Sequence, residues 1–257
     1  YKAGFDRNYW IWEERKDGFS YMLVADVARG DGKDYSVFHI IKIETMEVVA
    51  EYQGKPAPDV YGNMLYSAGK EYGNCLLVVE NNSVGFAVLD KLRELEYPNL
   101  YYSVKSTHEY VSQLEAEVMS NSVPGFTTSQ KTRPLIVAKL EEFIRNKLIT
   151  LYSSRIANEL KTFIWNNGRP EAMRSYNDDL TMALAIACWV RDTALESNKR
   201  EVEYQKAFLT SMVVSNTKFS TAMPGMKGYD RKYDLDKGTK MKQSIKEQKE
   251  FFWVYKG

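Results

Sequence analysis

The sequence has little cysteine, little histidine and no long apolar run, and each scarcity excludes a class of protein. The two cysteines, Cys75 and Cys188, lie far apart in apolar stretches, which excludes a disulfide scaffold and predicts buried free thiols. No apolar run approaches the roughly 18 residues that span a bilayer, so no membrane partner is expected. The formal net charge is only +1, so nucleic-acid binding would have to use a local basic patch.

The scarcity of histidine and the absence of a P-loop motif argue against two classes of enzyme. The only histidines are His39, inside an apolar stretch, and His108, in a polar one, so a Ser–His–Asp or Cys–His hydrolase is not indicated. No G-x-x-x-x-G-K-[ST] motif is present, which excludes a P-loop nucleotide-binding core. The chain nevertheless has material for a sizeable core, with 257 residues, 44% of them apolar.

The hydrophobic pattern predicts one α/β domain over residues 1–195, followed by a polar tail or appendage over 196–257. Residues 1–20 are interpreted as a leading segment. The chain begins at Tyr1 and shows no signal-peptide pattern, so we expect a piece of a longer protein. Three apolar stretches separated by short turns predict an antiparallel meander, over residues 21–27, 35–43 and 46–52.

A strand–helix–strand unit is predicted next. Helical spacing of apolar residues occurs over 56–72 and 83–95, and the apolar stretches 75–80 and 100–104 predict strands that lie parallel. The polar segment 105–132 is expected to be a long loop or hairpin. The later pattern predicts a helix over 132–148, a short strand over 149–152, a helix over 154–160, a hairpin around 167–170 and an Ala-rich helix opening at Asp178 and Asp179.

Acidic residues stand at the ends of these predicted elements. Asp26 interrupts the first apolar stretch, Glu80 ends the fourth, and Asp178 and Asp179 open the Ala-rich helix. A carboxylate among apolar residues is unfavourable unless it is paired, hydrogen-bonded or bound to a metal. Carboxylates without histidine or cysteine favour Mg²⁺ or Mn²⁺ over Zn²⁺. Convergence of these acids would suit two-metal phosphodiester hydrolysis.

Each acid also has a purely structural interpretation. Asp26 can be an ordinary strand-end acid, Glu80 can cap the helix that follows it, and Asp178 can be an N-cap. Asp179 would then sit in a first helical turn, where negative charge is favourable. The order β-β-β-α-β-α-β with a final acidic helix favours the joint interpretation, because this is the ribonuclease H-like arrangement of a mixed sheet flanked by helices.

Three stretches carry a specific resemblance: VADVARGDGKDYSVFHII, LLVVENNSVGFAVLDKL and YNDDLTMALAIA. In this order they resemble the nuclease motifs of the large terminase subunit of tailed bacteriophages, closest to the T4-like phages, over about residues 15–195. Many relatives have histidine before the acidic pair, where this chain has Asn177. The resemblance implies a packaging nuclease that cuts concatemeric, double-stranded viral DNA. In that family an ATPase domain precedes the nuclease domain, and the ATPase domain is not part of this sequence.

The resemblance also implies a set of site residues and partners. Asp26, Glu80 and Asp179 would be catalytic and, with Asp178, would hold two Mg²⁺ or Mn²⁺ ions, Asp179 being favoured over a capping Asp178. Asp31 and Asp34 would either lie behind the metal ligands and help to hold them, or be ordinary acids of the turn. Asp31 is the favoured candidate because it is nearer to Asp26 in the sequence. The implied partners are DNA, the ATPase domain, the portal and the small terminase subunit, at the procapsid in the host cytoplasm. Basic residues expected to contact DNA phosphates are Arg29, Lys33, Lys105, Lys131, Arg133, Arg169 and Arg174.

Two other functions stay open at this point. Another ribonuclease H-like nuclease, such as a Holliday-junction resolvase, would prefer branched DNA and act as an obligate dimer. A DNA-gripping module of a packaging motor would use the same acids only to hold structure, and would not cut plasmid DNA in the presence of manganese.

Overall fold

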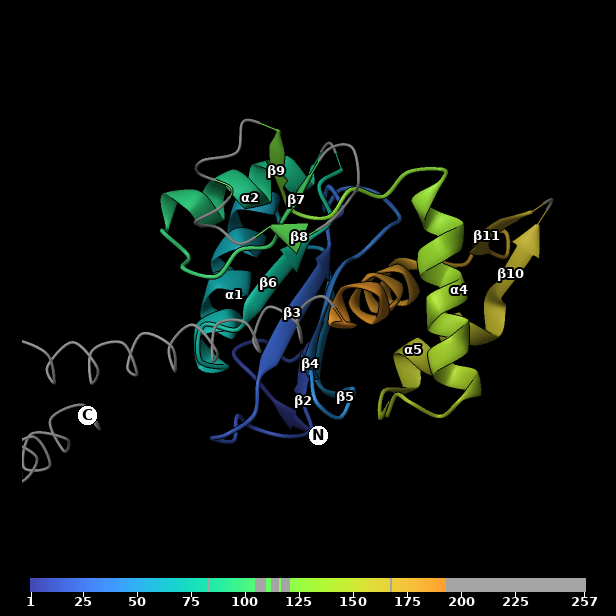
Figure 1. Cartoon of the computed structure of the whole chain (residues 1–257), viewed down its shortest axis with the longest axis horizontal. Helices are drawn as coiled ribbons and strands as arrows, with labels where there is room; N and C mark the ends of the chain where they lie inside the picture. Colours follow the sequence, from blue (N-terminus) through green and yellow to red (C-terminus); the bar gives the residue numbers. More distant parts are fainter. Residues whose placement is uncertain (83, 105–109, 112–115, 117–120, 167, 193–257) are drawn as a thin grey trace, which may run out of the picture. The chain divides into compact units, whose positions relative to one another are not determined.

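The computed structural model describes residues 1–82, 84–104, 110–111, 116, 121–166 and 168–192. Its centre is a mixed sheet in which β3 (Tyr21–Asp26), β4 (Ser36–Lys42) and β5 (Glu47–Gly54) are antiparallel neighbours. On its other side β3 pairs in parallel with β6 (Leu76–Val79). The predicted meander is therefore confirmed (Figure 1).

The leading segment contributes two strands that the sequence pattern does not reveal. β2 (Tyr9–Ile11) pairs with β5, and β1 (Lys2–Ala3) pairs with β2, giving the order β1-β2-β5-β4-β3-β6. Strands of two and three residues are too short to show an alternating pattern. The interpretation of residues 1–20 as only a leading segment is thus wrong for these two stretches.

Helices cover both faces of the sheet. α1 (Pro58–Glu71) and α2 (Gly85–Glu94) pack on the face that Leu23 and Ala25 present. α4 (Thr132–Arg145), α5 (Ser154–Thr162) and a helix over residues 179–192 pack on the opposite face (Figure 1). The 179–192 helix is buried along most of its length, and its alanines at positions 183, 185 and 187 allow close packing.

The predicted fifth strand leaves the main sheet almost at once. Leu100 forms a single parallel bridge with Leu77, after which β7 (Tyr102–Val104) pairs with β8 (Tyr110–Val111) and β9 (Ser122–Pro124) in a separate small sheet. The expectation of a main-sheet strand over 100–104 therefore holds only at Leu100. The chain returns to β6 at Phe126, whose bridge with Glu80 extends the sheet edge at that point.

The predicted hairpin and the predicted buried side chains are also found in the structure. The hairpin is confirmed as β10 (Phe163–Asn166) and β11 (Arg169–Ala172), whereas residues 149–152 form only a bridge between Thr150 and Glu47. Cys75 and Cys188 are buried free thiols, and His39 is a buried core residue. The predicted tail, residues 196–257, lies outside the described residues.

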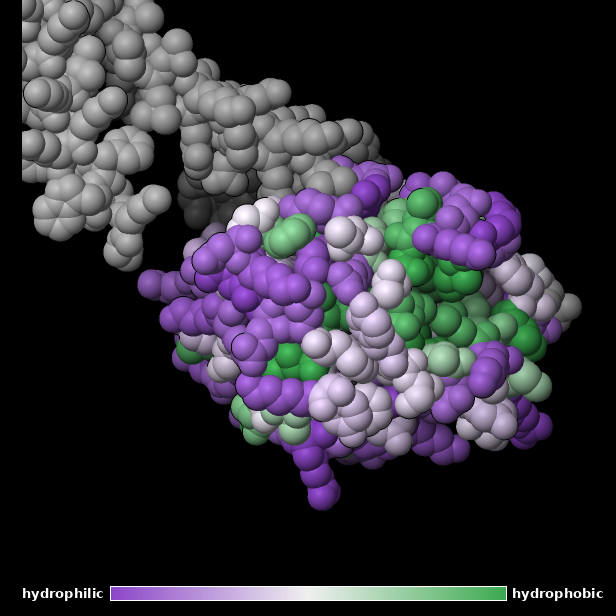
Figure 2. Space-filling view, turned by 90° about the horizontal axis from the view of Figure 1, so that it is seen from below, coloured by the Kyte–Doolittle hydropathy of each residue, from purple (hydrophilic) through white to green (hydrophobic). Residues whose placement is uncertain are grey.

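The surface of the described residues is mixed in character. Hydrophobic side chains gather toward one side of the face in Figure 2, next to extensive hydrophilic areas. Within the described ranges, no helix combines the length and the apolarity needed to cross a membrane.

Candidate active site

Asp26 and Glu80 meet because β3 and β6 are parallel neighbours. Asp26 is the last residue of β3, Glu80 directly follows β6, and the Glu80 amide donates to the Ala25 carbonyl at 2.9 Å. Their two carboxyl groups interact directly, by charge and through a hydrogen bond. The backbone on the far side of Glu80 is held by the Asn81 amide, which donates to the Phe126 carbonyl at 2.9 Å.

Asp179 approaches the same place from the opposite layer. It is the first residue of the 179–192 helix and is only 8% exposed. Its Oδ2 accepts from the Tyr35 amide at 2.9 Å and from Asn177 Nδ2 at 3.1 Å. Asn177 Nδ2 also donates to the Lys33 carbonyl at 3.1 Å, so this amide ties the helix start to the turn after β3.

Glu80 and Asp179 lie close enough to Asp26 to act on it electrostatically. Burial, the Glu80 carboxyl group and the charge of Asp179 raise the pKa of Asp26 well above its ordinary value, against the Val27 amide that donates to Asp26 at 2.7 Å. Burial raises the pKa of Asp179 to about 6. In the described part of the chain, however, no three His, Cys, Asp or Glu side chains are gathered into a finished metal cage.

Asp178 is directed elsewhere. Its carbonyl accepts the first intrahelical hydrogen bond, from the Met182 amide at 2.8 Å, which makes it the N-cap residue by position. Its carboxylate pairs with Arg133 of α4, and Arg133 Nε donates to the Pro170 carbonyl at 2.9 Å. The Arg133 side chain is 19% exposed. Arg133, expected to contact DNA, therefore joins α4, β11 and the acidic helix, and Asp178 is its counterion.

The turn after β3 carries the two acids expected to support the site. Asp34 is exposed and raises the pKa of Asp179 by its charge, so it lies within electrostatic reach of the acids. Asp31 is also exposed and forms an ion pair with Arg29 at 3.1 Å. The structure therefore links Asp34, and not the sequence-favoured Asp31, to the candidate site.

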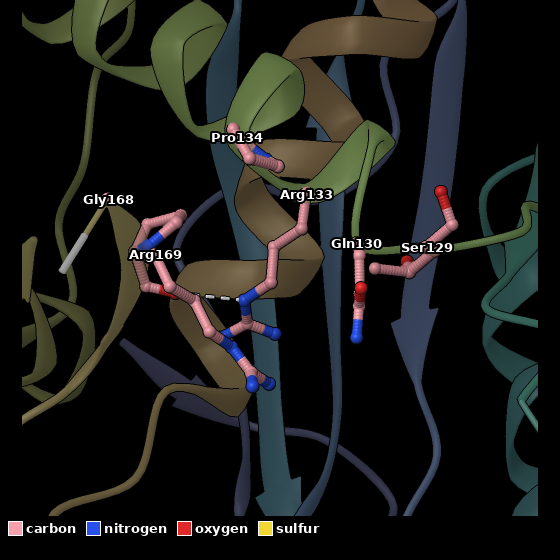
Figure 3. Close-up of a pocket in the computed structure, with 8 residues that line it drawn as sticks. Ser129, Gln130, Arg133, Pro134, Gly168 and Arg169 are labelled. Carbon is pink, nitrogen blue, oxygen red and sulfur yellow. Dashed lines mark hydrogen bonds between the residues drawn. The ribbon is translucent and has the colours of Figure 1, made fainter. Parts of the chain in front are cut away.

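An open cavity of about 470 Å³ lies beside Asp178, between the start of α4 and the tip of the β10–β11 hairpin. Figure 3 shows Arg133 and Arg169 at this cavity, with the Arg133–Pro170 hydrogen bond drawn as a dashed line. The start of α4 and the hairpin, which carry Arg133 and Arg169, thus come together here. The lining residues are Thr128, Ser129, Gln130, Arg133, Pro134, Gly168, Arg169 and Pro170.

The other predicted DNA contacts are surface cations. Arg169 is 66% exposed, and the side chains of Arg29, Lys33, Lys131 and Arg174 also lie on the surface. Lys105 and His108 lie outside the described residues. These positions are compatible with phosphate contacts, which need accessible charge and no particular base.

Two further buried acids, Glu159 and Glu51, predict that the stability of the folded chain falls as the pH rises. Burial raises the pKa of Glu159 to about 8 and that of Glu51 to about 7, both well above their unfolded value. Between pH 6.5 and 8 the unfolded chain has already released these protons, whereas the folded chain must give them up. Burial lowers the pKa of His39 to about 4, so the folded chain keeps it neutral while the unfolded chain loses its remaining proton above pH 6.5, which offsets about 0.4 kcal/mol of this loss.

We therefore expect the metal-free protein to lose about 2 kcal/mol of stability between pH 6.5 and pH 8. Urea unfolding at the two pH values in EDTA measures this loss. Glu159→Gln should flatten most of it. A wild-type stability that is constant or rises over this range would contradict the assignment.

Comparisons with known proteins agree with this architecture. No protein-family model matches the sequence, and no curated protein matches it. Among solved structures, the large terminase nuclease of thermophilic phage G20c with bound magnesium is similar at a TM-score of 0.57 and 16% identity, over 72% of this chain and 89% of that one. The Thermus phage P74-26 large terminase nuclease domain matches at 0.53 and 16% identity, over 70% and 84% of the two chains. These likenesses establish the ribonuclease H-like fold.

The G20c nuclease was also solved with cobalt and with zinc, at TM-scores of 0.56 and 0.51 to this chain. The neighbours are thus nuclease domains that accept several divalent metals. At 16–17% identity they share the fold with this chain, and the roles of its residues must be argued from its own geometry.

Proposed function

We propose that this chain is the nuclease domain of a large terminase subunit of a T4-like tailed phage. It would cut concatemeric double-stranded viral DNA during headful packaging. The observation that carries the proposal is that Asp26 and Glu80 stand at the ends of neighbouring parallel strands, while Asp179 accepts from the Tyr35 amide just before β4. The T4-like assignment is supported by the three motifs quoted above, and the nuclease role also by the phage nuclease neighbours.

The donor set suits a hard divalent cation. All three acids supply oxygen ligands, and the mutual repulsion that raises the Asp26 pKa is the condition a cation relieves. Asp26, Glu80 and Asp179 would hold two Mg²⁺ or Mn²⁺ ions, which supply an activated water and stabilise the leaving oxygen when bound. The Val27 and Tyr35 amides and the Asn177 side chain orient the ligands through hydrogen bonds.

The DNA would be held through its phosphates. Arg29 and Lys33 lie on the turn after β3, and Arg169 lies at the hairpin cavity. None of these side chains needs a particular base, so cutting would be largely independent of sequence. In the complete packaging motor, the ATPase domain, portal and small terminase subunit at the procapsid in the host cytoplasm would supply timing and position.

The proposal predicts that supercoiled plasmid is nicked and linearised in Mg²⁺ or Mn²⁺ and is untouched in EDTA. Cutting should weaken steeply as salt rises, because phosphate contacts are lost as counterions compete. An agarose-gel time course measures both effects, with Asp26→Asn as the negative control.

Three outcomes would contradict it. Full cleavage in EDTA excludes the metal-dependent mechanism. A strong preference for branched over linear duplex, by an obligate dimer, would favour a junction resolvase. DNA binding without any cleavage in manganese would favour a gripping module.

A further inference from the structure

We propose that Glu159 of α5 is a positioning residue for the candidate active site, an inference whose catalytic meaning rests on the proposed function. Glu159 holds the first turn of the 179–192 helix, so that Asp179 already faces Asp26 before a cation binds. The sequence pattern shows Glu159 only as one charged residue of a predicted helix. Its surroundings in the folded chain give it this role.

Glu159 contacts the helix start directly. It is 9% exposed, and its Oε2 accepts from the Thr181 amide at 3.0 Å and from the Thr181 hydroxyl at 3.3 Å. The first intrahelical donor is the Met182 amide, so the Thr181 amide belongs to the first turn, whose amides lack partners within the helix. The Glu159 side-chain oxygen therefore supplies an acceptor that this amide does not find within the helix.

The other contacts of Glu159 fix it to the sheet. Its Oε1 accepts from Gln53 Nε2, on β5, at 3.3 Å. Glu159 thereby connects β5, α5 and the helix that carries Asp179. The connection ends two residues from Asp179, which is close enough to set the direction of that side chain.

His39 holds the same turn from the middle of the sheet. This wholly buried residue of β4 places its Nε2 3.0 Å from the Leu180 carbonyl. A carbonyl oxygen can only accept, so Nε2 carries the proton and donates. Leu180 and Thr181, the two residues after Asp179, are thus both anchored by buried side chains from other elements.

The need for such anchoring follows from charge. Burial and the charges of Glu80 and Asp179 raise the pKa of Asp26, so holding these acids close together is unfavourable without a cation and needs contacts that fix the helix start. Glu159 is itself unfavourably buried, and burial raises its pKa to about 8. A residue kept only for packing would be apolar here. The hydrogen bonds to Thr181 account for an acidic residue at this position.

The test uses the full chain and two readouts that need no DNA. Mg²⁺ affinity is measured by calorimetry, and hydrogen exchange of the amides over 179–184 is measured in the metal-free protein. We expect Glu159→Ala to weaken Mg²⁺ binding about 10-fold or more and to speed exchange in this turn, because outer residues that orient metal ligands have effects of this size. Glu159→Gln, which keeps an acceptor oxygen, should stay within about 3-fold of wild type.

Ile156→Ala is the matched control. Ile156 is a buried apolar residue of the same helix, so its truncation lowers stability without removing a polar contact to the 179–192 helix. It should leave Mg²⁺ affinity unchanged at equal fraction folded. If Glu159→Ala fails to fold, Thr181→Val removes the hydroxyl contact alone and should weaken Mg²⁺ binding about 3-fold.

Two results would overturn the proposal. One is unchanged Mg²⁺ affinity and unchanged exchange in Glu159→Ala, or in Thr181→Val where Glu159→Ala does not fold. The other is an equal loss of affinity in Ile156→Ala, which would show a general effect of stability. If wild type binds Mg²⁺ but cuts no DNA, the proposed function fails while the positioning role still stands or falls on these readouts.

Discussion

Asp26→Asn is expected to reduce DNA cleavage by about 10³-fold or more and to leave the metal-free protein at least as stable as wild type. Burial and then the charges of Glu80 and Asp179 raise the pKa of Asp26. Asparagine removes a ligand oxygen and the negative charge that repels its neighbours. In EDTA, the thermal midpoint should therefore stay equal or rise by the equivalent of about 1 kcal/mol.

A structural Asp26 predicts the opposite result. If the hydrogen bond from the Val27 amide were its whole purpose, its replacement should destabilise the protein by about 1–3 kcal/mol and leave cleavage largely intact. Melting both proteins in EDTA and then in Mg²⁺ separates the two cases. Mg²⁺ should raise the wild-type midpoint more than the Asp26→Asn midpoint, because the ion stabilises the state that binds it.

Replacing Asp179 is expected to reduce DNA cleavage far more than replacing its neighbour Asp178. Asp179→Asn should lower cleavage by about 10³-fold, because Asp179 is the acid that interacts with Asp26. Asp178→Asn should lower it by less than about 10-fold, because that carboxylate serves Arg133. Rates at saturating Mg²⁺ for the two single variants measure the contrast.

The two variants control for each other, since they make the same chemical change at adjacent positions. Asp178→Asn should lower stability by about 1 kcal/mol, since it breaks a partly buried ion pair, without raising the Mg²⁺ requirement. Equal loss of cleavage in both variants would place Asp178 among the metal ligands.

Local pattern was sufficient to predict the elements that form the centre of the sheet. β3 and β6 are continuous apolar stretches ended by an acid, whereas the parallel pairing that joins them was not visible in the pattern. Pattern alone could not show that the chain leaves the sheet after Leu100. The place beside β6 is taken at Glu80 by Phe126, which belongs to the segment expected to be a loop or hairpin.

Gly125 explains why the segment that contains Phe126 can lie beside β6. It has φ +81°, and a Cβ there would lie 2.5 Å from the Val79 carbonyl, so only glycine lets the chain approach β6 so closely. A single glycine in a polar, turn-rich stretch carries no sign of such an approach. The strand neighbour of Glu80 was therefore beyond prediction from local sequence.

The candidate site also contains residues that the sequence reveals and residues that it does not. Acids at the ends of apolar elements are visible in a sequence, because their position is unfavourable without a partner. Arg133 and Glu159 are not, since an arginine and a glutamate on predicted helices have the same pattern as ordinary solvated charges. Their partners, Asp178 and Thr181, lie 45 and 22 positions away along the chain.

The spread of the three acids along the chain has a consequence for synthesis in a living cell. Asp26 and Glu80 leave the ribosome before Asp179, which begins the last helix that the structure describes. Chains fold from the N-terminal side during synthesis, so the sheet of the growing polypeptide precedes its complete set of acids. The proposed nuclease would therefore be inactive while this part of the chain is being translated, because its chemistry would begin only when the 179–192 helix docks.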